Sequence, residues 1–207
     1  KKSFDQIMTY KAELINSIEQ DFTFSKKPIN RFKIAEIDVE KKNLNKTNQI
    51  NELKRLINSI QNCNLRDNAK KFIFADGSID SPIMVIGESP GIEEEKYDKT
   101  FQGETGFLLK KMLMAIDIKR ESIYSTYAIH FRPPEDRKPT SKEIKRYSIF
   151  LKEHISIINP KIVILMGSSA MEAVTGLNNK ITDERGKWKE IILKNKTFPL
   201  MVTFSPS

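Results

Sequence analysis

The sequence predicts an α/β protein of three layers, with helices on both faces of a central, four-stranded parallel sheet. Short apolar runs alternate with segments of helical periodicity, and each apolar run ends in a loop rich in glycine, proline or serine. Strands that alternate with helices are joined by right-handed crossovers, which make the sheet parallel and cover both of its faces. The four predicted strands are Pro82–Ile86, Ile123–Ile129, Ile162–Met166 and Leu200–Phe204.

Helical signals occupy the segments between these strands. From Thr105 to Ile116 the large apolar residues recur on one face, which predicts a helix packed on the sheet. Thr140 and Glu143 have capping-box spacing and predict a second helix, which ends before the Asn159-Pro160 pair. A third helix is predicted over Ser169–Thr175, stopped by Gly176. The apolar face of the first helix contains Leu108, Leu109, Met112, Leu113 and Ile116.

The chain is predicted to have two parts, residues 1–49 and residues 50–207. The first part holds a helix over Phe4–Ile18 and then a polar stretch, rich in lysine and asparagine, without a clear period, which is typical of a linker. The second part opens with a short amphipathic helix over Ile50–Ile60 and contains the α/β domain.

Composition restricts the classes of function. Of the 207 residues 39% are hydrophobic, enough for a packed core, and no apolar run approaches membrane-crossing length. The net charge of +8 suits a phosphate backbone as partner, and residues 107–147 hold ten lysines and arginines against five acids. A solvated basic surface is the alternative. The lone cysteine, Cys63, excludes an internal disulfide and a four-cysteine metal site, so a cytoplasmic protein is expected.

The loops at the strand ends hold the candidate site. Carboxyl ends of parallel strands meet at one edge of a sheet, where α/β proteins bind ligands. The run Gly87-Glu88-Ser89-Pro90-Gly91 follows the first strand and carries one carboxylate, and glycine lets a ligand approach the backbone closely.

Seven motifs in this order resemble the uracil-DNA glycosylase superfamily, most closely its family 4, the iron–sulfur type. The resemblance covers about Ile60 to Ser207, nearly three quarters of the chain. The motifs are Gly87–Gly91, Glu93-Glu94-Glu95, Phe101–Leu109, Arg132–Arg137, Pro160–Gly167, Arg185-Gly186 and Ser205-Pro206-Ser207.

The resemblance implies hydrolysis of the bond between deoxyribose and uracil, or another deaminated base, after the nucleotide has flipped out of DNA. Glu88 and Glu94 match positions that order or activate the attacking water, and Ser205 lies in the loop that supports catalysis. The implied base-binding residues are Gly87, Ser89, Phe101, on which the base stacks, and Tyr127. The implied DNA contacts are Arg132, Arg137, Ser168, Arg185 and Ser207. The expected protein is a monomer that binds DNA and no membrane.

Three positions depart from the family pattern. The four cysteines of the cluster correspond to Ile60, Cys63, Phe131 and Tyr147, and one thiolate does not hold a four-iron cluster, so we expect no iron. Tyr127 stands where an asparagine reads uracil, and Ser205 stands where a histidine donates to the leaving base. Losing such a donor costs on the order of a hundredfold in rate.

Other interpretations remain open at this point. A catalytically weakened relative that binds DNA through its basic loops is the second function, and an unrelated α/β enzyme that binds phosphate at Gly87–Gly91 is the third. The two glycines can simply shape a turn, Phe101 can be plain core, and Arg132 and Arg137 can be surface charges. Glu93, Glu94 and Glu95 can form a solvated run, whereas Cys63 and His154 are interpreted as structural.

Overall fold

The computed structural model describes residues 31–60 and 63–207, and side chains from residue 45 onward. The chain divides into two compact units, residues 1–42 and 43–207. The helix α2 (Arg31–Asn58) begins in the first unit and ends in the second. The sheet and the candidate site belong to the second unit. The predicted helix over Phe4–Ile18 lies outside the described residues.

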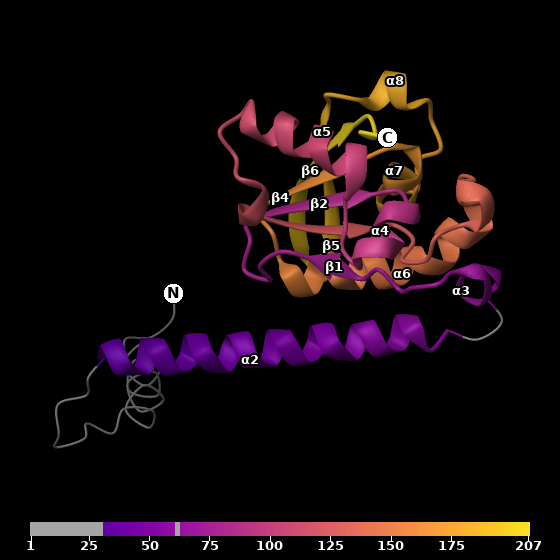
Figure 1. Cartoon of the computed structure of the whole chain (residues 1–207). Helices are drawn as coiled ribbons and strands as arrows, with labels where there is room; N and C mark the ends of the chain where they lie inside the picture. Colours follow the sequence, from indigo (N-terminus) through magenta and orange to yellow (C-terminus); the bar gives the residue numbers. More distant parts are fainter. Residues whose placement is uncertain (1–30, 61–62) are drawn as a thin grey trace, which may run out of the picture. The chain divides into compact units, whose positions relative to one another are not determined.

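The sheet has six strands in the order β1-β3-β2-β4-β6-β5 (Figure 1). The four central strands are parallel, as predicted: β3 (Ile123–Tyr127), β2 (Ile83–Gly87), β4 (Ile162–Met166) and β6 (Lys196–Thr203). Two further strands, β1 (Ala75–Asp76) and β5 (Trp188–Leu193), extend it at its two edges and run antiparallel to their neighbours. The sheet is therefore mixed, and these edge strands were not predicted.

The β5–β6 hairpin has a turn that the sequence signals only weakly. Leu193 pairs with Lys196, so the turn consists of Lys194 and Asn195, both with positive φ (48° and 62°). Such two-residue turns ordinarily carry glycine, since residues with a Cβ resist this conformation. The missing glycine explains why the hairpin escaped prediction.

Helices cover both faces of the sheet, which gives the predicted three layers. One face packs on Leu109 and Leu113 of α5 (Gly103–Met114), which lies opposite α6 (Ser141–Ile158) in Figure 1. The other face packs on α6, on α7 (Ser168–Thr175) and on the later part of α2. Shorter helical segments complete the described part: α3 (Asn64–Asn68), α4 (Ile92–Tyr97), α8 (Ile181–Glu184), η1 (Arg120–Ser122) and η2 (Pro134–Asp136).

Local signals placed two helices correctly. The capping box of α6 is present, with the Thr140 amide donating to Glu143 at 2.7 Å and the Glu143 amide donating to Thr140 Oγ1 at 3.3 Å. Helix α7 ends at Gly176, whose φ is 75°. The linker expected up to residue 49 is wrong over residues 31–49, because α2 is one helix from Arg31 to Asn58.

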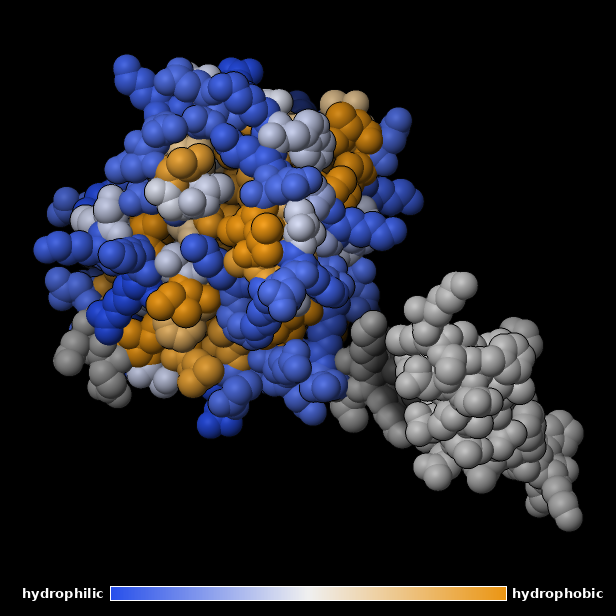
Figure 2. Space-filling model, turned by 180° about the vertical axis from the view of Figure 1, so that it is seen from behind, coloured by the Kyte–Doolittle hydropathy of each residue, from blue (hydrophilic) through white to orange (hydrophobic). Residues whose placement is uncertain are grey.

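Helix α5 lies where predicted, but its expected apolar face is only partly buried. Leu109 and Leu113 are buried, whereas Leu108, Met112 and Ile116 are 45%, 37% and 60% exposed. Apolar side chains are also exposed on β5. Trp188 pairs with Met201, which pairs with Ile164 of the cluster under α5, so Trp188 and Ile192 point to this same face of the sheet. Figure 2 shows apolar surface gathered on the back of the molecule, within a hydrophilic surround. Among the described residues no helix is long and apolar enough to cross a membrane.

Two histidines lie fully buried in an aromatic cluster beneath the sheet. His154 of α6, interpreted as structural, accepts or donates a 2.8 Å hydrogen bond with Tyr124 Oη and stacks on Phe74 at 4.7 Å. His130 stacks on Phe74 from 5.6 Å. Burial lowers the pKa of His130 to about 3 and puts the pKa of His154 well below its ordinary value, so both rings are neutral in the folded protein.

The burial of these two neutral rings predicts that the protein loses stability in mild acid. Below about pH 6.5 both histidines become protonated in the unfolded chain, whereas in the folded chain they stay neutral. The protein is therefore fully stable above that pH and loses stability below it. The free energy of unfolding falls by about 2.7 kcal/mol per pH unit for the two groups. Urea unfolding between pH 7.5 and pH 5, above the range of most carboxylates, measures this slope.

The His130→Phe variant supplies the control, because phenylalanine suits the aromatic cluster and does not titrate. We expect its slope to be about half that of the unaltered protein. Equal slopes for both proteins, or a stability that does not change above pH 5, would contradict the neutral burial of these rings.

Candidate active site

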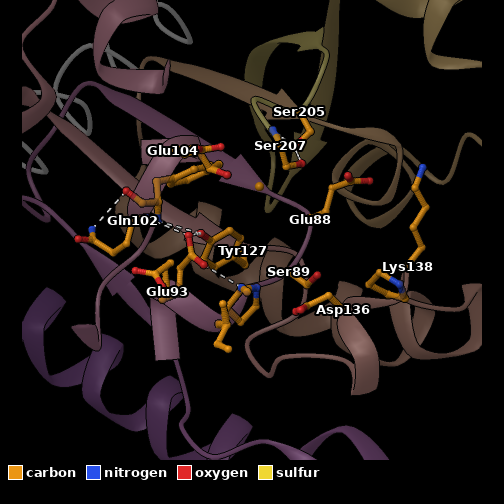
Figure 3. Close-up of a pocket in the computed structure, with 18 of the residues that line it drawn as sticks. Glu88, Ser89, Glu93, Gln102, Glu104, Tyr127, Asp136, Lys138, Ser205 and Ser207 are labelled. Atoms are coloured by element: carbon orange, nitrogen blue, oxygen red, sulfur yellow. Dashed lines mark hydrogen bonds between the residues drawn. The ribbon is translucent and has the colours of Figure 1, made fainter. Parts of the chain in front are cut away.

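The carboxyl ends of the parallel strands meet at one edge of the sheet, and a cavity of about 550 Å³ lies there. The loop after β2, the turn before α5, the segment 136–139 and the end of the chain line it (Figure 3). The predicted site residues on its wall are Gly87, Glu88, Ser89, Glu94, Phe101, Tyr127, Arg137, Ser205 and Ser207. The structure therefore brings together residues from four distant parts of the sequence.

Glu88 is held at the amino end of α7. Its Oε1 accepts hydrogen bonds from the Ser169 amide at 2.9 Å and from Ser168 Oγ at 3.2 Å. A helix amino terminus favours a negative charge, so this contact fixes the carboxylate at the cavity wall. Gly167 makes room for it: φ is 99° there, and a Cβ would lie 2.3 Å from Glu88 Cδ. Ser168, which was predicted to contact DNA, therefore donates its hydroxyl to the Glu88 carboxylate in this structure.

Phe101 and Tyr127 form an aromatic wall beside Gly87. Their ring centroids are 5.1 Å apart, and a Cβ on Gly87 would lie 2.8 Å from the Phe101 ring and 2.7 Å from the Tyr127 ring. The absence of a side chain at position 87 therefore allows both rings to approach the strand end. Phe101 lines the cavity and is 4% exposed, so most of its surface packs in the core.

Glu94 is a buried carboxylate shared by three donors. Its Oε2 accepts from the Gly91 amide at 2.9 Å, and its Oε1 accepts from the Gln102 amide at 2.9 Å and from Tyr127 Oη at 3.2 Å. Glu95 is equally buried and accepts from the Lys70 amide at 2.8 Å. The alternative of a solvated acidic run is therefore wrong for these two residues, each of which joins separate segments of the chain.

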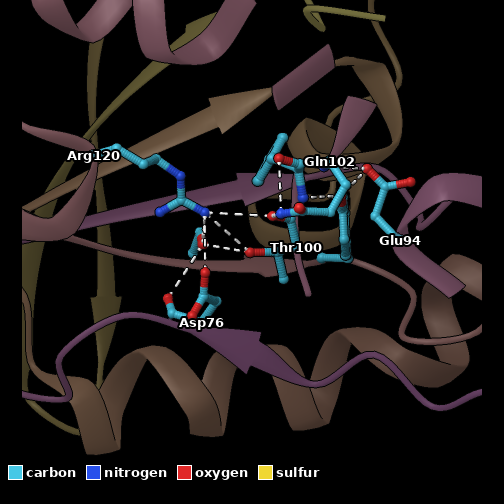
Figure 4. Close-up of polar contacts among 8 residues, drawn as sticks. Asp76, Glu94, Thr100, Gln102 and Arg120 are labelled. Carbon is cyan, nitrogen blue, oxygen red and sulfur yellow. Dashed lines mark hydrogen bonds and ion pairs between the residues drawn. The ribbon is translucent and has the colours of Figure 1, made fainter. Parts of the chain in front are cut away.

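A second polar group centres on Arg120 (Figure 4). Its guanidinium donates to Ser125 Oγ at 2.9 Å and to Thr100 Oγ1 at 3.3 Å, and lies 3.6 Å from Asp76. Burial lowers the pKa of Arg120, and the charge of Asp76 opposes that shift. Sequence reasoning missed this group, because its members lie far apart in the chain and match no motif.

Two of the three predicted DNA-binding arginines, Arg132 and Arg137, have acidic neighbours. Arg132 donates to both carboxylate oxygens of Asp136 at 2.6 Å and to Glu95 at 3.4 Å, outside the cavity wall. Arg137 lines the cavity and donates to Glu143, whose pKa falls to about 2 chiefly through that hydrogen bond. Arg185 lies 4.4 Å from the Phe204 ring. Lys138, which was not predicted, is exposed on the cavity wall.

Three of the four positions expected to correspond to the cluster cysteines, Cys63, Phe131 and Tyr147, meet in space but do not suit a metal. Cys63 Sγ lies 3.1 Å from Tyr147 Oη, and the Phe131 and Tyr147 rings are 6.3 Å apart, with Cys63, Phe131 and Tyr147 buried. Ile60 packs against the same core cluster. One thiol beside a phenol and two apolar side chains does not provide the thiolates that a four-iron cluster needs. The described side chains contain no group of three or more histidine, cysteine or acidic residues placed to hold a metal ion.

The fold and this site define a member of the uracil DNA glycosylase superfamily. The model of that superfamily matches residues 74–207, and the chain belongs to it. The chain is 35% identical over 146 residues to the type-4 uracil-DNA glycosylase of Thermotoga maritima, covering 70% of this chain and 74% of that protein. The type-4 enzyme of Archaeoglobus fulgidus is 26% identical over 162 residues, 76% of this chain and 81% of that protein.

A third relative is a DNA polymerase of Bacillus phage SP01. It is 33% identical over 126 residues, which are 60% of this chain and 13% of the polymerase. A domain similar to this one therefore forms a small part of a much longer polymerase chain.

Proposed function

We propose that this protein is a DNA glycosylase that hydrolyses the N-glycosidic bond of uracil, or of another deaminated base, after flipping the nucleotide out of DNA. One observation carries the proposal: the Glu88 carboxylate and the Phe101 ring line the same cavity at the strand ends of a chain of this family. The two relatives from Thermotoga maritima and Archaeoglobus fulgidus are, by their names, uracil-DNA glycosylases.

The arrangement supports a division of tasks in this reaction. A flipped base entering the cavity meets the Phe101 ring, which offers a stacking surface, and the backbone of Gly87–Gly91, which offers N–H donors to its carbonyl groups. The bond breaks as C1′ becomes cationic and the electron pair leaves with the base. Glu88, anchored through Oε1, has its Oε2 available to stabilise the cationic sugar and to take a proton from the attacking water.

Basic side chains at the cavity support DNA binding. Arg137 and Lys138 lie on its wall, which the serine loop, residues 205–207, also lines. Neutralising phosphates at this rim would supply affinity that is independent of sequence and depends on salt. We propose that the protein binds DNA as a monomer, in the cytoplasm, without a membrane contact.

Ser205 and Tyr127 are the reason for considering a second candidate function, DNA binding with little or no catalysis. Ser205 Oγ lies 2.6 Å from Ser207 Oγ, and a serine hydroxyl carries no positive charge to stabilise a departing anion. Such a loss lowers rates by on the order of a hundredfold. A relative that binds DNA but excises bases slowly or not at all is therefore the alternative, and the excision assay separates the two.

The excision assay uses labelled single- and double-stranded DNA with one uracil, with hypoxanthine in a parallel substrate. We expect abasic sites from the unaltered protein, and at least a hundredfold lower single-turnover rate for Glu88→Gln, which removes the negative charge at the sugar. Gly167→Ala should lose a similar factor, because its Cβ would displace the Glu88 carboxylate.

Gly176→Ala is the matched control. Gly176 also has positive φ (75°), but a Cβ there meets nothing within 4 Å, so the variant bears the backbone strain without moving Glu88. Its excision rate should stay within about threefold of the unaltered protein, with a cost of about 1 kcal/mol in stability. The glycosylase proposal would be overturned if the protein bound DNA in a salt-dependent way but gave no abasic product at stoichiometric concentration. That result would favour the DNA-binding relative.

We also propose that the protein contains no iron–sulfur cluster. Tyr147 and Phe131 pack against each other at positions where the family resemblance implies cysteines. Burial and the hydrogen bond to Cys63 raise the pKa of the Tyr147 phenol. Protein purified without oxygen should be colourless, with less than one tenth of an iron per chain by elemental analysis. A brown protein with several irons per chain would contradict the proposal.

A further inference from the structure

Phe101 holds a backbone conformation that phenylalanine rarely adopts. Its φ is 51°, in the left-handed region, which costs a residue with a Cβ about 1 kcal/mol. Such a conformation persists only where the surroundings hold it. Gly106 leaves room for the Phe101 backbone, because a Cβ at position 106 would lie 1.9 Å from the Phe101 carbonyl oxygen. The polar groups around the segment 100–102 show what holds it.

The Tyr127 hydroxyl is one of these holding groups. It accepts a 2.8 Å hydrogen bond from the Phe101 amide and donates at 3.2 Å to Glu94, which also accepts from the Gln102 amide. Burial raises the pKa of Tyr127 well above its ordinary value, and the charge of Glu94 adds to the shift, so the phenol keeps its proton. That one proton is donated to Glu94, so the hydroxyl has none to offer a base in the cavity.

The preceding residue, Thr100, has an anchor of its own on the same strand. Thr100 is fully buried, its Oγ1 lies 2.6 Å from Ser125 Oγ, and it accepts from Arg120 at 3.3 Å. Ser125 and Tyr127 both belong to β3, so the central sheet holds Thr100 and Phe101 by two adjacent anchors. The Gln102 side chain closes the segment, since its Nε2 donates to the Thr100 and Phe101 carbonyl oxygens at 2.9 and 3.2 Å.

We propose that Tyr127 is a positioning residue, whose hydroxyl fixes the Phe101 ring in the orientation that receives the base, and that it does not read the edge of the base. This proposal rests on the proposed function, because the ring matters for catalysis only if a base stacks on it. At the position where the family resemblance implies an asparagine amide that reads the base, Tyr127 instead bonds the backbone of the pocket wall. Misplacing a binding group by about 1 Å costs on the order of a hundredfold in rate, so this contact has a measurable value.

The test compares Tyr127→Phe with Tyr124→Phe. Both residues are buried tyrosines of β3, and each variant removes one phenol oxygen that makes a buried hydrogen bond, but Tyr124 bonds His154 on the opposite face of the sheet. We expect Tyr127→Phe to lower the single-turnover excision rate by about tenfold to a hundredfold, with the Kd for DNA within twofold. Tyr124→Phe should keep the rate within threefold at a comparable loss of stability.

Hydrogen exchange provides a readout that does not depend on activity. Exchange of the Phe101 and Gln102 amides should accelerate by about tenfold or more in Tyr127→Phe and should not change in Tyr124→Phe. If the unaltered protein excises no base, the proposed function fails, and the exchange result still decides whether Tyr127 holds the segment.

Two results would overturn the proposal: unaltered rate and exchange in Tyr127→Phe, or equal loss of rate in both tyrosine variants. If Tyr127→Phe does not fold, Thr100→Val takes its place, because it removes the adjacent anchor and keeps the side-chain volume. That variant should have a smaller effect in the same direction, about threefold to tenfold slower excision with unaltered DNA binding, and an unaltered rate would overturn the proposal.

Discussion

The candidate site depends on one buried carboxylate. Glu94 is 5% exposed, and a buried charge is tolerated only when hydrogen bonds replace its water. Its three donors come from the loop after β2, the turn before α5 and strand β3. The glycine loop, the turn that carries Phe101 and the sheet are therefore tied together by a single group. Loss of that carboxylate would release three walls of the cavity at once.

The Tyr127 ring, whose hydroxyl donates to this carboxylate, forms part of the cavity wall. Gly87 leaves room for this ring, because a Cβ at position 87 would lie 2.7 Å from it. Away from the cavity, Cys63 and Tyr147 bond each other and Phe131 packs beside them. In both places buried aromatic side chains pack closely against their neighbours.

Local sequence signals were sufficient for the parts of the fold that are determined locally. The apolar runs placed the four parallel strands, and Thr140 with Glu143 placed the start of α6. The hairpin at Lys194-Asn195 was missed because its turn lacks glycine, and the helical stretch of α2 before residue 50 was missed because its polar residues show no apolar period. Nine residues of the cavity wall were predicted as site residues from the family resemblance, whereas Lys138 was not. The contacts of Arg120 with Thr100 and Ser125 depend on tertiary structure that no local pattern reports.

A crystal structure with DNA that carries an uncleavable uracil nucleotide would show where the base binds. We expect this arrangement: the base lies outside the duplex, parallel to the Phe101 ring at stacking distance, with Glu88 at the sugar and the Tyr127 hydroxyl still bonded to the Phe101 amide. A base that stays stacked in the duplex, or that lies away from Phe101, would contradict it.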